Sequence, residues 1–115
     1  MTLLDFSRAE VDHSAVVLAV QGEVDISNAA ELDAALRAAE RPGSQALVID
    51  LSGLDFIDLC GLRVLADCQQ RRRAAERSLV VVTKPLVRQV IDVLNGALAP
   101  IDTASSLADA LRAVA

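Results

Sequence analysis

Residues 50–62 have the sequence Asp-Leu-Ser-Gly-Leu-Asp-Phe-Ile-Asp-Leu-Cys-Gly-Leu, which predicts a strand that leads through a short turn into a helix. The apolar run 47–49 just before it is short and bounded by polar residues, as is typical of a strand covered on both faces. Asp58 is placed to cap the helix, because its carboxylate can accept from the free N–H groups of the first turn. We therefore expect a strand over 46–51 and a helix over 59–75.

The predicted helix has an apolar face and a polar face when its residues are laid out at 100° each. Leu59 falls on the polar face, at the tip of the helix, where it has no core to fill. Single exposed leucines are common on protein surfaces, so this position alone does not identify a site. The apolar face contains Gly61, Leu62, Val64, Leu65 and Cys68, and the polar face contains Leu59, Cys60, Arg63, Asp67, Gln70 and Arg71.

Length and composition limit the class of protein. A chain of 115 residues is long enough for one domain with its own core, and we expect a single domain over residues 1–115. Aromatic residues make up only 2% of the chain, so the flat side chains that stack on nucleic-acid bases are scarce. The formal net charge of −5 argues further against binding to nucleic acid or to an anionic membrane.

The two cysteines and the absence of a secretory leader favour a cytoplasmic location. No apolar run approaches the ~20 residues needed to span a bilayer, so we expect no membrane insertion. Cys60 and Cys68 fall on one predicted helix, about 12 Å apart along its axis. That separation is too large for a disulfide between them.

The rest of the chain alternates between apolar strands and amphipathic helices. Gly22 is expected to end the second strand, and Ser27 or Asn28 to cap the helix that follows. Two strands followed by alternating helices and strands predict an α/β fold, a mixed and mostly parallel sheet of four to five strands with about four helices. We expect strands over 3–11, 16–20 and 79–83, and helices over 28–40, from residue 84 and from residue 105.

The sequence also makes predictions for the end of the helix 59–75 and for the helix from residue 84. Arginines 71, 72 and 73, with Arg77, end the helix 59–75, where cations complement the negative end of the dipole. We interpret them as a solvated helix end, and a basic docking site is the alternative. The helix opened by Lys84 and Pro85 has an apolar stripe that we predict to be buried, made of Val87, Val90, Ile91 and Leu94.

The stretch 50–62 resembles the signature loop of STAS domains, a family that includes anti-sigma factor antagonists and the tails of sulphate transporters. In the antagonists the signature usually has the sequence Asp-Ser-Ser-Gly-Leu, and its first serine is phosphorylated by a partner anti-sigma factor that is also a kinase. By this resemblance Asp58 matches the aspartate and Gly61 the glycine. Leu59 takes the place of the phosphorylated serine and Cys60 that of the second serine. Leucine has no hydroxyl, so the usual switch cannot operate there.

The resemblance covers the whole chain and includes residues 22–25, where the family usually has glycine, an acidic residue, an apolar residue and aspartate. It implies that Asp25 and Asp58 lie on one face of a STAS fold. It also implies a bacterial regulator of transcription that binds a kinase-type anti-sigma factor and releases a sigma factor, with no enzymatic activity, cofactor or metal. The partner-binding residues it implies are Asp25, Ser27, Asp58, Leu59, Cys60, Gly61 and Arg63.

Three alternatives are weaker. The same fold also serves as the STAS subunit of a transport or lipid-trafficking complex. A thiol-dependent sensor or enzyme would use Cys60, since a helix dipole favours a thiolate in the first turn. The negative charges of Asp58 and Asp25 favour the neutral thiol instead. The simpler interpretation is that Cys60 passively replaces the serine. Asp50 and Lys84 faintly resemble a phosphoryl-accepting receiver, but the chain has too few strands for one.

Overall fold

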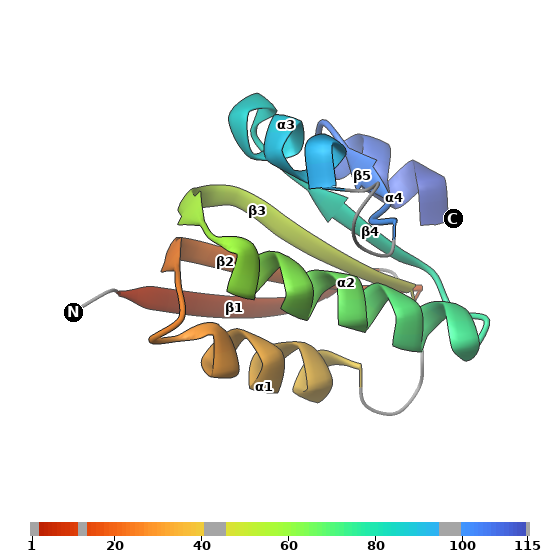
Figure 1. Cartoon of the computed structure of the whole chain (residues 1–115). Helices are drawn as coiled ribbons and strands as arrows, with labels where there is room; N and C mark the ends of the chain where they lie inside the picture. Colours follow the sequence, from red (N-terminus) through yellow and green to blue (C-terminus); the bar gives the residue numbers. More distant parts are fainter. Residues whose placement is uncertain (1–2, 12–13, 41–45, 95–99, 115) are drawn as a thin grey trace.

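The structure, a computed structural model, describes residues 3–11, 14–40, 46–94 and 100–114. Within these ranges the chain forms one sheet in the order β1-β2-β3-β4-β5 with four helices (Figure 1). β1 is antiparallel to β2 and the other pairings are parallel, which confirms the predicted α/β class. No helix in these ranges is long and apolar enough to cross a membrane. The elements are β1 Leu4–Val11, β2 Ala15–Val24, α1 Ala29–Ala39, β3 Ala46–Ile57, α2 Leu59–Ala74, β4 Leu79–Val82, α3 Pro85–Leu94, β5 Thr103–Ala104 and α4 Leu107–Val114.

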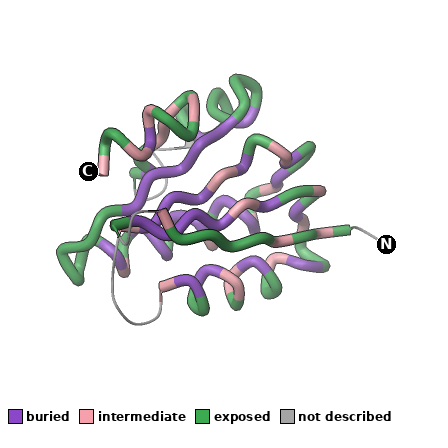
Figure 2. Tube along the Cα trace, turned by 180° about the vertical axis from the view of Figure 1, so that it is seen from behind, coloured by how far each residue is buried: buried purple, intermediate pink, exposed green. Residues whose placement is uncertain are grey.

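Both faces of the sheet have apolar layers, because successive residues of a strand point to opposite sides. α1, α2 and α3 cover one face, where Leu36, Leu65 and Ile91 are buried in a common core. α4 covers part of the other face, where Ala110 packs with Val48. α1 and α2 run side by side along the sheet (Figure 1). The helices leave β1, which was predicted as a strand over 3–11, as a mostly exposed edge strand (Figure 2).

Two strands are longer than predicted. The expectations that Gly22 ends the second strand and that the third ends at residue 51 are wrong, since β2 continues to Val24 and β3 to Ile57. The added residues of β2 pair with the added residues of β3. The register of this pairing shifts at two points. Gly22 fits within this pairing because its φ is 114°, and a Cβ there would collide with the carbonyl oxygen of Leu3.

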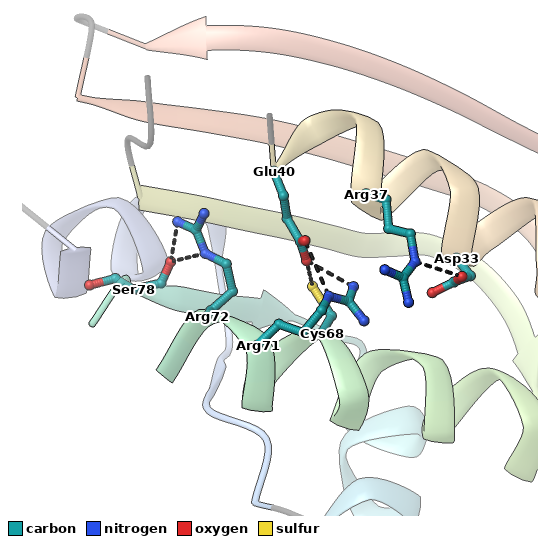
Figure 3. A network of polar contacts seen from close by, with 7 residues as sticks. All are labelled: Asp33, Arg37, Glu40, Cys68, Arg71, Arg72 and Ser78. Carbon is teal, nitrogen blue, oxygen red and sulfur yellow. Dashed lines mark hydrogen bonds and ion pairs between the residues drawn. The ribbon is translucent and has the colours of Figure 1, made fainter. Parts of the chain in front are cut away.

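The interpretation of a solvated helix end is wrong for Arg71 and Arg72, which are half-buried and buried (Figure 3), whereas Arg73 and Arg77 are exposed. Arg71 forms an ion pair with Glu40 at 2.9 Å. Arg72 is buried, and its guanidinium donates to the Ser78 carbonyl oxygen at 2.9 and 3.2 Å. Arg73 donates to the segment that leads into β5. The Arg71 contact joins α2 to the end of α1, and the contacts of Arg72 and Arg73 join it to the segments that precede β4 and β5.

Cys68 is buried, as predicted, but it is more than a small apolar residue (Figure 3). Its Sγ donates to the Glu40 carboxylate at 2.7 Å, and the same carboxylate accepts from Arg71. Burial, then the hydrogen bond to Glu40 and the charge of Glu40, raises the pKa of the Cys68 thiol. The thiol therefore stays protonated and acts as a donor that joins α1 to α2. Cys60 and Cys68 are both free.

The apolar stripe of α3 is only partly buried. Val87 and Ile91 are buried against the sheet, as predicted. Val90 is exposed, contrary to the prediction, because the helix meets the sheet along the line of Val87 and Ile91 and leaves Val90 at its margin. The side chain of Leu94 lies outside the described residues.

Candidate partner-binding site

The carboxyl ends of β2, β3 and β4 lie at one edge of the sheet because these strands are parallel. Asp25 directly follows β2, and Asp58 directly follows β3. The last residues of the two strands, Val24 and Ile57, are paired. The backbone N–H of Asp58 also donates to the Val24 carbonyl oxygen at 3.0 Å. Asp25 and Asp58 are therefore neighbours at this edge, as expected.

The loop between β2 and α1 is held by its own side chains. Asp25 Oδ1 accepts from the backbone N–H of Ser27 at 2.9 Å and from the Ser27 hydroxyl. Asn28 occupies the N-cap position of α1, as predicted, but its side chain makes no cap bond. The Asn28 amide accepts from the Asp25 N–H and donates to the Glu23 carbonyl oxygen, both at 2.9 Å. These bonds fix a loop in which Ile26 is 81% exposed.

The start of α2 is set by Asp58 and Gly61. Asp58 is the N-cap, as predicted, and its carboxylate accepts from the Gly61 N–H at 3.2 Å. Gly61 is buried, and a Cβ there would lie 2.6 Å from Val24 Cγ1 and 2.7 Å from Ile57 Cγ1. Only glycine lets the helix start pack this closely on the two strand ends. Gly61 therefore positions the site and is not part of its surface.

Three large apolar side chains close to these aspartates in the sequence are exposed: Ile26, Phe56 and Leu59. Phe56 is 50% exposed and Leu59 is 47% exposed. Leu59 was predicted from its place on the helix, whereas Ile26 and Phe56 were missed. Their signal was available in the sequence, because each is a large apolar residue within two positions of a site aspartate.

The remaining predicted residues complete the surface. Cys60 is half-buried and Arg63 is exposed on the first turns of α2. The described residues contain no group of three His, Cys, Asp or Glu side chains that could hold a metal ion. The side chains near the start of α2 and the β2–α1 loop therefore include apolar ones, two carboxylates and one guanidinium.

Comparisons with known proteins agree with this arrangement. The family model described as "Mlab, STAS domain" matches residues 7–97. BtrV of Bordetella bronchiseptica, named as a candidate anti-sigma factor antagonist, is 35% identical over 79 residues, 68% of each chain. The anti-sigma-F factor antagonist RsfB of Mycobacterium tuberculosis is 34% identical over 85 residues, 73% of this chain and 70% of that protein.

A solved structure is similar over nearly the whole chain. The crystal structure of an anti-sigma factor antagonist from Mycobacterium paratuberculosis is 31% identical, with a TM-score of 0.82 over 97% of this chain and 94% of that one. The order of strands and helices is thus common to both proteins. The chain belongs to the anti-sigma factor antagonist family of STAS-domain proteins, which are regulatory proteins and not enzymes.

Proposed function

We propose that this chain binds a kinase-type anti-sigma factor through the carboxyl edge of its sheet and thereby releases a sigma factor. Leu59 is the observation that supports this most, because a large apolar side chain is 47% exposed where the β2–α1 loop and the start of α2 meet. Beside Asp25 and Asp58, at the position that matches the family's phosphorylated serine, this side chain can bury apolar surface against another protein. The proposed contact residues are Asp25, Ser27, Asp58, Leu59, Cys60 and Arg63.

We also propose that phosphorylation at residue 59 does not control binding. A phosphoserine at the matching place would add about −1.5 to −2 charges beside Asp25 and Asp58 and repel the partner. Leu59 cannot accept a phosphoryl group, and its burial on binding would contribute up to about 1.5–3 kcal/mol. Control then depends on the amount of this protein, on another signal, or on oxidation of the free thiol at Cys60.

The test is calorimetric titration against the kinase-type anti-sigma factors of the source bacterium, produced one by one. For the factor that binds most tightly, Leu59→Asp should weaken the affinity at least tenfold, about 1.4 kcal/mol, because it places a third carboxylate beside Asp25 and Asp58. Gln70→Asp introduces the same charge on the exposed face of α2, away from the site, and should leave the affinity unchanged. Equal affinities for the wild type and Leu59→Asp would exclude Leu59 from the interface.

Failure of the whole panel would have a different meaning. A chain that binds none of these factors, and instead binds the ATPase or permease subunit of a transporter, would be a subunit of a transport complex. The same set of titrations therefore separates a wrong residue from a wrong partner.

A further inference from the structure

The charged residues of the candidate site differ in how far the protein itself satisfies them. The Asp25 carboxylate accepts from Ser27, and the Asp58 carboxylate accepts from the Gly61 N–H. Arg63 is exposed, and its guanidinium forms no ion pair or hydrogen bond with any residue that the structure describes. Its five N–H donors are therefore free to bind a group outside this chain.

A guanidinium without a partner is uncommon in this protein. Within the described ranges, every other lysine and arginine except Arg77 has a side-chain ion pair or hydrogen bond. The arginines at the end of α2 also complement the negative end of the helix dipole, whereas Arg63 lies in the second turn, nearer the positive end. Neither an internal contact nor the dipole therefore accounts for a cation at residue 63.

Arg63 lies next to Leu59 on the surface of α2. The two residues are four positions apart, so their Cβ atoms are about 5–6 Å apart on one face of the helix. Both side chains are exposed. A carboxylate suits this guanidinium, because the two groups form a pair of parallel hydrogen bonds. Asp25 and Asp58 repel a carboxylate at the neighbouring positions, so the charges favour one place for it, at Arg63.

We propose that Arg63 binds an aspartate or glutamate side chain of the anti-sigma factor, next to the surface that covers Leu59. Leu59 then contributes apolar contact, and Arg63 fixes the orientation of the partner and selects among related factors. A factor with lysine or arginine at that place would be repelled. This inference rests on the proposed function and adds to it the chemistry of the partner at one position.

The test measures binding kinetics with the anti-sigma factor that binds the wild type most tightly, first without nucleotide. Arg63→Glu should weaken the complex at least about tenfold, and its association rate should no longer fall as salt rises. Arg77→Glu is the matched control, since Arg77 is also exposed and without a side-chain partner among the described residues, but lies beyond the far end of α2. Its effect should be less than about twofold. Circular dichroism should show both variants folded like the wild type.

Two further variants test the proposed carboxylate directly. Arg63→Lys keeps the charge but loses the parallel pair of hydrogen bonds, so the complex should weaken by only about threefold. In the anti-sigma factor, each exposed aspartate and glutamate is replaced in turn by arginine. One of these replacements should bind Arg63→Glu at least about tenfold more tightly than the unchanged factor does, because the ion pair is restored with its charges exchanged.

The outcomes separate this inference from the proposed function. If Leu59→Asp weakens the complex while Arg63→Glu binds like the wild type, Arg63 makes no contact and the proposed function stands. Equal losses for Arg63→Glu and Arg77→Glu would show a general effect of net charge and overturn the inference. A loss that occurs only when the factor holds ATP would identify the anion as a nucleotide phosphate and overturn it as well. If the wild type binds no anti-sigma factor, both the inference and the proposed function fail.

Discussion

The backbone N–H of Asp58 donates a hydrogen bond to the carbonyl oxygen of Val24 at 3.0 Å. Val24 ends β2 and Asp58 caps α2, so this bond joins the two loops that form the candidate site. The two aspartates and Leu59 are therefore placed by backbone geometry, and the geometry depends on how closely α2 approaches the strand ends. Substitutions at the start of α2 can test that dependence.

Gly61→Ala should destabilise the fold by about 1–3 kcal/mol, as expected when a tightly packed position is overfilled. The added Cβ would lie 2.6 Å from Val24 Cγ1, and both Val24 and Gly61 are buried. Gly53→Ala is the matched control, since its Cβ would meet the Gln21 side chain at 2.7 Å and that exposed side chain can move. Urea unfolding measures both free energies. Equal losses for the two variants would contradict the close packing of α2 on the strand ends.

Asp58→Ala should lower the free energy of unfolding by about 1 kcal/mol, the usual effect of losing an N-cap side chain. The bond lost is the one from the Gly61 N–H to the Asp58 carboxylate, 3.2 Å long. Asp67→Ala removes an exposed carboxylate from the same helix and should change stability by less than about 0.5 kcal/mol. Thermal or urea unfolding of the pair gives the comparison, and similar values for both would show that the cap contributes nothing specific.

The structure shows which features the sequence could predict. α2 and its cap were predicted because an N-cap and a helical apolar face depend on residues close together in the chain. The ends of β2 and β3 were not predicted, because each extension is stabilised by pairing with the other strand. Gly22 pairs with Leu54, for example, and the two residues are about 30 positions apart in the sequence. The residues around Gly22 in the sequence do not reveal that Leu54 pairs with it, so the end of the strand could not be placed from them.

The same distinction applies to individual side chains. Arg72 lies four positions after Cys68, on the buried stripe of α2, so its position was visible in the helical pattern. Its burial was not predicted, because an arginine is buried only when a partner such as the Ser78 carbonyl accepts its donors. Val90 shows the opposite case, an apolar residue left exposed by the way α3 meets the sheet.

Stability should decrease in alkaline solution because of Cys68. Burial, then the bond to Glu40 and the charge of Glu40, raises the pKa of its thiol above the ordinary 9.0. Above pH 9.0 the unfolded chain loses a proton that the folded chain keeps, so the free energy of unfolding falls as pH rises, by about 1.4 kcal/mol per unit. The stabilisation is fully present below that pH.

Urea unfolding of the wild type and Cys68→Ala across this alkaline range measures the effect. The other titrating groups are common to both proteins, so the difference between the two slopes belongs to Cys68. Cys60→Ala is the matched control: it also removes one thiol but keeps Cys68 and its bond to Glu40, so it should retain the alkaline loss of stability that Cys68→Ala lacks. Parallel slopes for the wild type and Cys68→Ala would contradict a protonated thiol bound to Glu40.

The most direct measurement is native mass spectrometry of the wild type and Leu59→Ser, each with the anti-sigma factor it binds, with and without ATP and magnesium. We predict that the wild-type complex survives ATP and that the wild-type chain gains no phosphoryl group. Leu59→Ser should gain one phosphoryl group and dissociate, because the hydroxyl is restored beside Asp25 and Asp58. A phosphoryl gain that dissolves the wild-type complex would contradict binding that is independent of phosphorylation.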